Sequence, residues 1–125
     1  MTEDTITNLP ARAEPARSPA TTLAALAAVP EEEVWLAKQK SARTRRAYRL
    51  DVAHFLAAVG IGSAGELRQV DHKAVIAWEQ FMREVEQVVP STVRRRLSAL
   101  LSLYKHLVHH GQASKNPVTS LNGLP

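Results

Sequence analysis

The sequence contains no cysteine, which excludes a disulfide framework, a thiolate metal site and a cysteine nucleophile. It also lacks a long apolar run. The longest, LAALAAV from Leu23 to Val29, is far shorter than the ~20 residues that a membrane-spanning helix needs. Prolines at positions 10, 15 and 19 precede this run and disfavour a secretory signal. We therefore expect a soluble protein of the cytoplasm.

Acidic residues are missing from two parts of the chain. None follows Glu86, and none lies between Lys38 and Arg49, where basic residues are frequent. The formal net charge is +4. Because a surface that carries only positive charge repels itself, these two parts predict a polyanionic partner such as nucleic acid.

Composition divides the chain into three parts. Residues 1–30 are rich in alanine, threonine and proline and contain no aromatic residue, which predicts a disordered leader. Residues 31–114 carry apolar residues at helical spacing and are expected to form one helical domain. Residues 115–125 include NPVTSLNGLP, which predicts an extended segment that leaves the domain and starts an interdomain linker.

Capping signals predict the first three helices. A proline followed by three glutamates opens a short helix at residue 31. Ser41 caps a second helix that Gly60 ends, a loop follows, and Asp71 caps a third helix. The buried side chains expected on the second and third helices are Tyr48, Val52, Phe55, Leu56, Val59, Ala74, Val75, Trp78, Met82 and Val85.

A last, longer helix is expected after a chain break at Pro90. Ser91 or Thr92 caps it, and Gly111 ends it. Its apolar face is expected to hold Val93, Leu97, Leu100, Leu101, Tyr104, Leu107 and Val108. Since no stretch alternates with period two, the predicted fold class is all-α, a bundle of four to five helices.

The basic residues are expected on the outer faces of two helices. At ~100° per residue, Arg43 and Arg46 lie opposite the apolar stripe of the second helix, Arg49 lies on its flank, and Leu50 points outward. The outer face of the last helix is expected to carry Arg94, Arg95, Ser98, Ser102, Lys105 and His109. A single charged residue is more often plain solvated surface, but two acid-free faces together favour phosphate binding.

The order and spacing of these residues resemble a known family. Over residues 31–125 the chain is similar to the N-terminal core-binding, SAM-like domain of tyrosine recombinases, the phage-integrase and Xer-type enzymes. Members typically read S-x-x-T-x-x-x-Y-x-x-D-L-x-x-F, then S/T-x-x-R-x-L-S-A-L-R-x-F-Y-x-Y-L-x-x-x-G, then N-P-x-x-x-L-x-x-P. The matching residues are Ser41, Thr44, Tyr48, Asp51, Val52, Phe55, Thr92, Arg95, Leu97, Ser98, Ala99, Leu100, Leu103, Tyr104, Leu107, Gly111, Asn116, Pro117, Leu121 and Pro125. The chain departs from the pattern at Leu101, where the family has arginine.

The resemblance implies an orthogonal SAM-like bundle that clamps one face of a double-stranded DNA recombination site. The residues expected to contact DNA are Arg43, Thr44, Arg46, Arg49, Ser91, Thr92, Arg94, Arg95, Ser98 and Lys105. It also implies two further partners, a C-terminal catalytic domain and other recombinase protomers, and a nucleoid-associated location in the cytoplasm. No cofactor is expected.

The family's catalytic residues are not expected in this chain. The H-x-x-R box of the family occurs nowhere in the sequence, and Tyr48 and Tyr104 sit on apolar helix faces, which predicts core positions for both. We therefore expect no DNA cleavage by this chain. Because its last residues match the start of the family's interdomain linker, we expect a truncated chain or a natural half.

Three alternatives stay open beside this interpretation. His106 and His110 have the i, i+4 spacing of two-histidine metal sites, but no carboxylate ligand is near, so no metal is expected. A helical module whose basic surface meets an acidic protein would fit the same charges. A helix-turn-helix regulator would need a tight turn between helices, which the Gly60–Val70 region does not resemble.

Overall fold

The computed structural model describes residue 26 and residues 28–119, and every regular element in this part of the chain is helical. The elements are α3 (Glu31–Ala37), α4 (Ala42–Val59), α5 (Ala64–Arg68), α6 (His72–Gln80), the π-helical turn η3 (Phe81–Val85) and α7 (Pro90–His109). The predicted all-α fold class is confirmed. The chain divides into two units, Met1–Glu33 and Val34–Pro125. The predicted leader, residues 1–30, lies almost wholly outside the described residues and stays a prediction.

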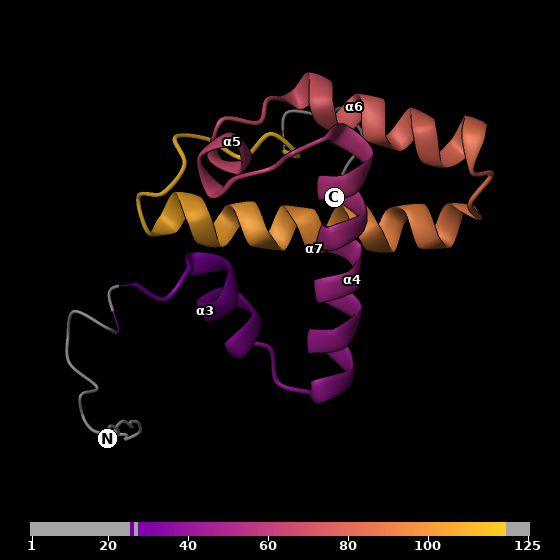
Figure 1. The fold of residues 1–125 in the computed structure, drawn as a ribbon. Coiled ribbons are helices and arrows are strands. Elements are labelled where there is room, and N and C mark those ends of the chain that lie inside the picture. Colours follow the sequence, from indigo (N-terminus) through magenta and orange to yellow (C-terminus); the bar gives the residue numbers. More distant parts are fainter. Residues whose placement is uncertain (1–25, 27, 120–125) are drawn as a thin grey trace, which may run out of the picture. The chain divides into compact units, whose positions relative to one another are not determined.

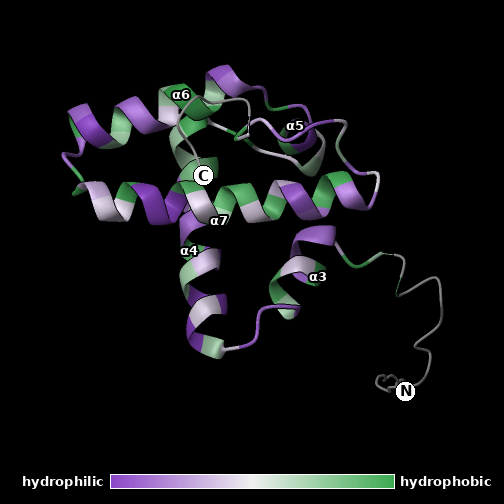
Figure 2. Ribbon diagram, turned by 180° about the vertical axis from the view of Figure 1, so that it is seen from behind, coloured by the Kyte–Doolittle hydropathy of each residue, from purple (hydrophilic) through white to green (hydrophobic). Residues whose placement is uncertain are grey.

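The second unit is built around two crossing helices. α4 runs across α7, and α6 runs alongside α7 in both views (Figure 1 and Figure 2). Hydrophobic and hydrophilic residues alternate along α7, as in an amphipathic helix (Figure 2). The core between the helices consists of Trp35, Leu36, Val52, Phe55, Leu67, Val75, Trp78, Met82, Val93, Leu97, Leu100, Leu103, Tyr104, Leu107 and Val118.

α4 begins and ends where its capping residues predict. The Ser41 hydroxyl accepts a hydrogen bond from the Thr44 N–H (3.0 Å), and Gly60 ends the helix in the left-handed conformation with a φ of 74°. Val52 and Phe55 are buried, and Tyr48 packs against the core with part of its surface exposed. The spacing of apolar residues was therefore sufficient to orient this helix.

α5 lies in the segment that was expected to be a loop. Its N-cap is Ser63, whose hydroxyl accepts from the Glu66 N–H (3.1 Å), while the Glu66 carboxylate accepts from the Gly62 N–H (2.6 Å). Ser63 and Glu66 have the spacing of a capping box, and this signal could have predicted the helix. Leu67 enters the core, and its carbonyl accepts a hydrogen bond from the Tyr104 hydroxyl (2.5 Å).

The third predicted helix is α6 continued by η3. Asp71 caps it as predicted, accepting from the N–H groups of Lys73 (3.0 Å) and Ala74 (3.3 Å). Trp78 is buried, but the expectation that Val85 is buried is wrong, because its exposed fraction is 69%. A π-helical turn contains more residues than an α-helical turn, so η3 moves Val85 out of the stripe that the regular spacing predicts.

α7 starts two or three residues earlier than its predicted caps imply. Pro90 is the first helical residue instead of a chain break, and Val89 occupies the N-cap without a side-chain hydrogen bond. The prediction of Ser91 or Thr92 as the cap is therefore wrong. Proline fits the first helical position because the N–H that it lacks has no acceptor within the helix there.

The buried surface of α7 is wider than its predicted stripe. Ala99, Leu103 and His106 are buried as well, whereas Val108 is exposed against expectation. The reason is that α7 is covered on several sides, since α3, α4, α5 and η3 all contribute residues that contact it. A helix in the middle of a bundle can bury more than one face.

The segment after α7 folds back onto the bundle. Pro117 and Val118 are buried, and the Asn116 side-chain amide donates to the Leu101 carbonyl (3.1 Å). The expectation of an extended segment is wrong up to residue 119, because two apolar side chains next to each other are stabilised by burial. Leu121 and Pro125, which the family pattern includes, lie outside the described residues.

Candidate nucleic-acid interface

The outer face of α4 presents arginine side chains. Arg43, Arg46 and Arg49 are exposed. Thr44 is half-buried, and its hydroxyl accepts a hydrogen bond from the Ser41 hydroxyl (2.9 Å). Thr44 thus belongs to the N-terminal cap of α4, and its contact with DNA stays a prediction.

Arg45 differs from the three exposed arginines around it. Its Nη1 donates to the Gln39 carbonyl (2.7 Å), and the side chain is half-buried. This hydrogen bond holds the segment that connects α3 to α4 against the first turns of α4. Arg45 is therefore turned away from the outer face, although its charge is the same.

The predicted residues of α7 also lie at the surface. Ser91, Arg94, Arg95, Ser98 and Lys105 are exposed. Thr92 is half-buried, and its N–H donates to the Val89 carbonyl (3.0 Å) within the first turn. The backbone N–H of Thr92 is thus engaged by the chain itself.

A buried carboxylate joins the two helices. Asp51 of α4 has an exposed fraction of only 3%, and its Oδ2 accepts a hydrogen bond from Nη1 of Arg95 of α7 (2.5 Å). A buried carboxylate needs a cationic partner to offset its desolvation, and Arg95 provides one.

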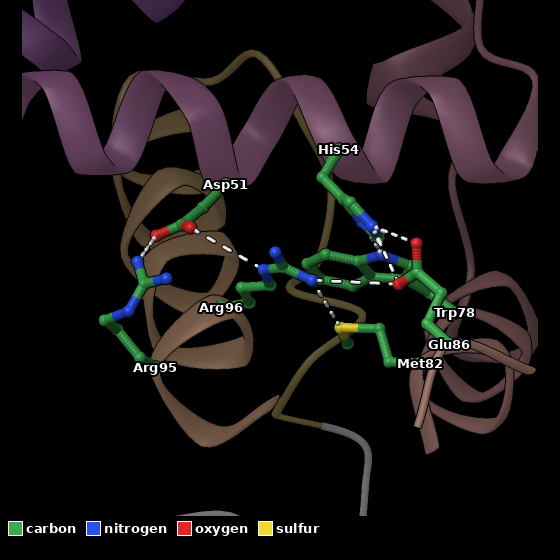
Figure 3. A network of polar contacts seen from close by, with 7 residues as sticks. All are labelled: Asp51, His54, Trp78, Met82, Glu86, Arg95 and Arg96. Atoms are coloured by element: carbon green, nitrogen blue, oxygen red, sulfur yellow. Dashed lines mark hydrogen bonds and ion pairs between the residues drawn. The ribbon is translucent and has the colours of Figure 1, made fainter. Parts of the chain in front are cut away.

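Arg96 extends this contact into a network that the sequence analysis missed (Figure 3). Its Nε lies 3.9 Å from Oδ1 of Asp51, and its Nη1 lies 3.8 Å from the Glu86 carboxylate and 3.7 Å from the Met82 sulfur. Arg96 is adjacent to Arg94 and Arg95 in the sequence and carries the same charge. Arg96 differs from Arg94 and Arg95 only in the direction in which its side chain leaves α7. A sequence indicates that direction only through the helical spacing.

His54 closes the network on the side of α6. Its Nδ1 accepts a hydrogen bond from the Trp78 indole N–H (2.9 Å), and its Nε2 lies 2.9 Å from the Glu86 carboxylate. Because Nδ1 accepts, the ring proton is on Nε2, which donates to Glu86. The network therefore fixes α4, α6 and α7 relative to one another beneath the basic surface.

A hollow of about 310 Å³ lies where α4 and α7 meet. Leu50 and Ala47 line it from α4, and Arg95 and Arg96 line it from α7. Leu50 is 70% exposed, as its outward position on the helix predicts. Of the residues predicted to contact DNA, only Arg95 lines this hollow, and the predicted arginines of α4 lie outside it.

Lys105 lies at a second, larger groove of about 720 Å³ between α3, α7 and residues 116–119. Trp35 of α3 contributes to it and donates from its indole N–H to the Ser102 hydroxyl (2.9 Å). The expectation that Ser102 belongs to the outer face is therefore wrong, because α3 covers this side of α7. Lys105 is thus separated from the hollow at Arg95.

Both tyrosines pack against the core, as predicted. Tyr104 is completely buried, and its hydroxyl donates to the Leu67 carbonyl. Tyr48 is half-buried and stacks on Trp35, with 5.3 Å between the ring centroids. Neither ring is placed as an exposed nucleophile.

The histidines of HLVHH lie at the C-terminal end of α7. His106 is buried, whereas His109 and His110 are exposed. In the part of the chain that the structure describes, no group of three or more histidine, cysteine, aspartate or glutamate residues could hold a metal ion. Among the same residues, no helix is long and apolar enough to cross a membrane.

A sequence-family model, described as "Phage integrase, N-terminal SAM-like domain", matches residues 31–111. The match covers α3 to α7 and therefore both basic helices. It confirms the resemblance that the spaced motifs indicate. No curated protein and no solved structure matches the chain.

Proposed function

Because the chain belongs to the family of phage integrase N-terminal SAM-like domains, we propose that it binds double-stranded DNA as part of a site-specific tyrosine recombinase. In this proposal α4 and α7 hold the recombination site from one side. A separate catalytic domain cuts the DNA, and other recombinase protomers occupy the remaining parts of the site. The chain itself contributes binding and no bond cleavage.

The distribution of charge on α4 and α7 is the observation that carries this proposal. α7 contains no acidic residue, and the one acidic residue of α4, Asp51, is buried. All charges that these two helices expose are therefore positive. A surface selected only for solubility usually mixes both signs, since pairs of opposite charge stabilise helices.

The hollow where α4 and α7 meet adds a geometric reason. Arg95 of α7 reaches Asp51 of α4, so the two helices that carry the exposed arginines are in contact at this point. Phosphate groups follow one another along a DNA backbone, and two adjoining basic helices can contact several of them together. This arrangement favours a duplex over a small anion.

A charge-reversal experiment tests the proposal. Arg46→Glu combined with Arg94→Glu places acidic groups on both helices without breaking the contact between Asp51 and Arg95, and we expect binding to a fluorescent DNA duplex, measured by anisotropy, to be lost. The control Lys73→Glu combined with Arg83→Glu makes the same change in net charge at exposed positions of α6 and η3, outside α4 and α7, and should retain most of the binding.

A competitor separates DNA from an acidic protein as the partner. Unlabelled duplex DNA should displace the labelled duplex, whereas poly-L-glutamate at the same concentration of negative charge should displace little. Equal competition would favour a module that binds acidic proteins. Binding that survives the reversal on α4 and α7 would contradict the proposed surface.

A further inference from the structure

Asp51 is positioned to control what Arg95 can bind. It is the only acidic residue within α4 and α7, and it is buried below the hollow that Leu50 and Arg95 line. A carboxylate beneath a DNA-binding surface weakens the attraction for phosphate. The position of Asp51 is therefore not explained by a contribution to the overall affinity for DNA.

The carboxylate of Asp51 is held from both sides (Figure 3). Oδ2 accepts from Nη1 of Arg95, and Oδ1 faces Nε of Arg96 at 3.9 Å. Arg96 is itself fixed between Glu86 and the Met82 sulfur. Asp51 is thus a rigid acceptor, and it restricts the rotamers that Arg95 can adopt.

Arg95 still offers donors to a ligand. Its side chain is 47% exposed, and among the described residues its Nε and Nη2 have no hydrogen-bond partner. A guanidinium held by one nitrogen presents its other N–H groups in a fixed plane. Such a plane can donate to a pair of acceptors, as on a phosphate or on the O6 and N7 edge of a guanine.

From this geometry we infer that Asp51 is a positioning residue that directs Arg95 to the edge of a guanine in the major groove, with O6 and N7 as acceptors. This inference rests on the proposed binding of DNA. The neighbouring Leu50, exposed and apolar in the same hollow, suits a base edge and not a phosphate.

Two opposite effects of Asp51→Asn follow from this inference. The substitution removes a negative charge near the DNA, so the affinity for any duplex should stay equal or rise. It also weakens the hold on Arg95, so the preference for the correct sequence should fall. A residue with only a structural role would lower both affinities together.

The test uses a DNA site selected by the protein itself. The wild-type chain is used to enrich sequences from a randomised duplex pool, and its dissociation constants are measured for the enriched duplex and for a scrambled duplex of the same composition. We expect Asp51→Asn to reduce the ratio of the two affinities by roughly 5- to 100-fold, the discrimination that one bidentate arginine provides. The affinity for the scrambled duplex should not fall.

Base substitution and a matched pair of arginine variants supply the controls. Replacement of one guanine of the enriched site by 7-deazaguanine, which lacks the N7 acceptor, should weaken binding by the wild-type chain and have little effect on Asp51→Asn. Arg95→Ala should reduce mainly the affinity for the enriched duplex. Arg94→Ala removes the adjacent exposed arginine and should reduce both affinities by similar factors.

Several results would overturn the inference. The first is an Asp51→Asn variant whose ratio of affinities for the enriched and scrambled duplexes equals that of the wild-type chain. The second is a randomised pool from which no sequence is enriched. The third is a wild-type chain whose binding is weakened by 7-deazaguanine at no position of the site. If circular dichroism shows that Asp51→Asn does not fold, equal behaviour of Arg94→Ala and Arg95→Ala would overturn it instead. Failure of the wild-type chain to bind either duplex would overturn the proposed function as well. Binding without sequence preference would overturn only the inference about Asp51, so the two conclusions can be tested separately.

Discussion

The salt dependence of DNA binding provides a quantitative test of the basic surface. Setting aside Arg95, which we infer to face a base, the predicted contacts include five exposed cations: Arg43, Arg46, Arg49, Arg94 and Lys105. Each phosphate contact contributes about −0.9 to the slope of log K against log salt concentration, so five contacts predict a slope of roughly −4.5. Between 50 and 200 mM salt the affinity should then fall by roughly 500-fold.

Removal of one contact should change this slope by a known amount. Arg46→Ala should reduce the slope to roughly −3.6 and the affinity at 0.1 M salt by about eightfold. Arg45→Ala is the matched control on the same helix, because the Arg45 side chain donates to the Gln39 carbonyl and does not face outward. Its slope should stay close to that of the wild-type chain.

Fluorescence anisotropy titrations at four or more salt concentrations measure these slopes. A wild-type slope shallower than about −2 would mean that few of the exposed cations reach phosphate. Equal slopes for Arg45→Ala and Arg46→Ala would mean that only the net charge of the chain affects DNA binding and that the direction in which each arginine of α4 points does not. Either result would refute the surface assigned here.

Two further predictions concern stability, each measured by thermal unfolding. Tyr104→Phe leaves the Leu67 carbonyl without its hydroxyl donor and should lower the free energy of unfolding by about 1–2 kcal/mol. For a domain of this size each kcal/mol corresponds to a fall of roughly 4–8 °C in the melting temperature. Tyr48→Phe should have little effect, and equal shifts for the two variants would contradict the role of the buried hydrogen bond. Gly60→Ala should destabilise by about 1 kcal/mol because φ is +74° there, although no atom lies within 4 Å of the added Cβ, whereas Gly65→Ala within α5 should stabilise by up to about 1 kcal/mol. Stabilisation by Gly60→Ala would show that the C-terminal end of α4 is not held in the left-handed conformation.

The type of each helix and most of the helix limits could be predicted from local sequence patterns. Ser41 and Asp71 cap α4 and α6 because their side chains accept from N–H groups two or three residues away, and such local contacts can be read from spacing. The exposed positions of Arg43 and Arg46 could be predicted for the same reason, since helical periodicity separates the two faces of α4. The family match rests on this local pattern as well.

The local pattern failed where the backbone departed from a regular α-helix. Val85 is exposed because a π-helical turn shifts the phase of the helix, and nothing in the spacing of apolar residues marks that turn. Ser91 and Thr92 are not caps, because proline was interpreted as a break although it fits the first helical position. The first error comes from a local change of helix type, and the second from a proline position that local helix geometry allows.

The charges that act together could not be predicted from local patterns, because they depend on how the helices pack. Arg94, Arg95 and Arg96 are identical neighbours in the sequence, yet Arg95 reaches Asp51 while Arg96 lies between Asp51 and Glu86. Asp51 and Arg95 are 44 positions apart, and their contact exists because α4 crosses α7 at that level. The energy of a buried charge depends on the atoms that surround it, and those atoms are brought together only by the packing of the helices.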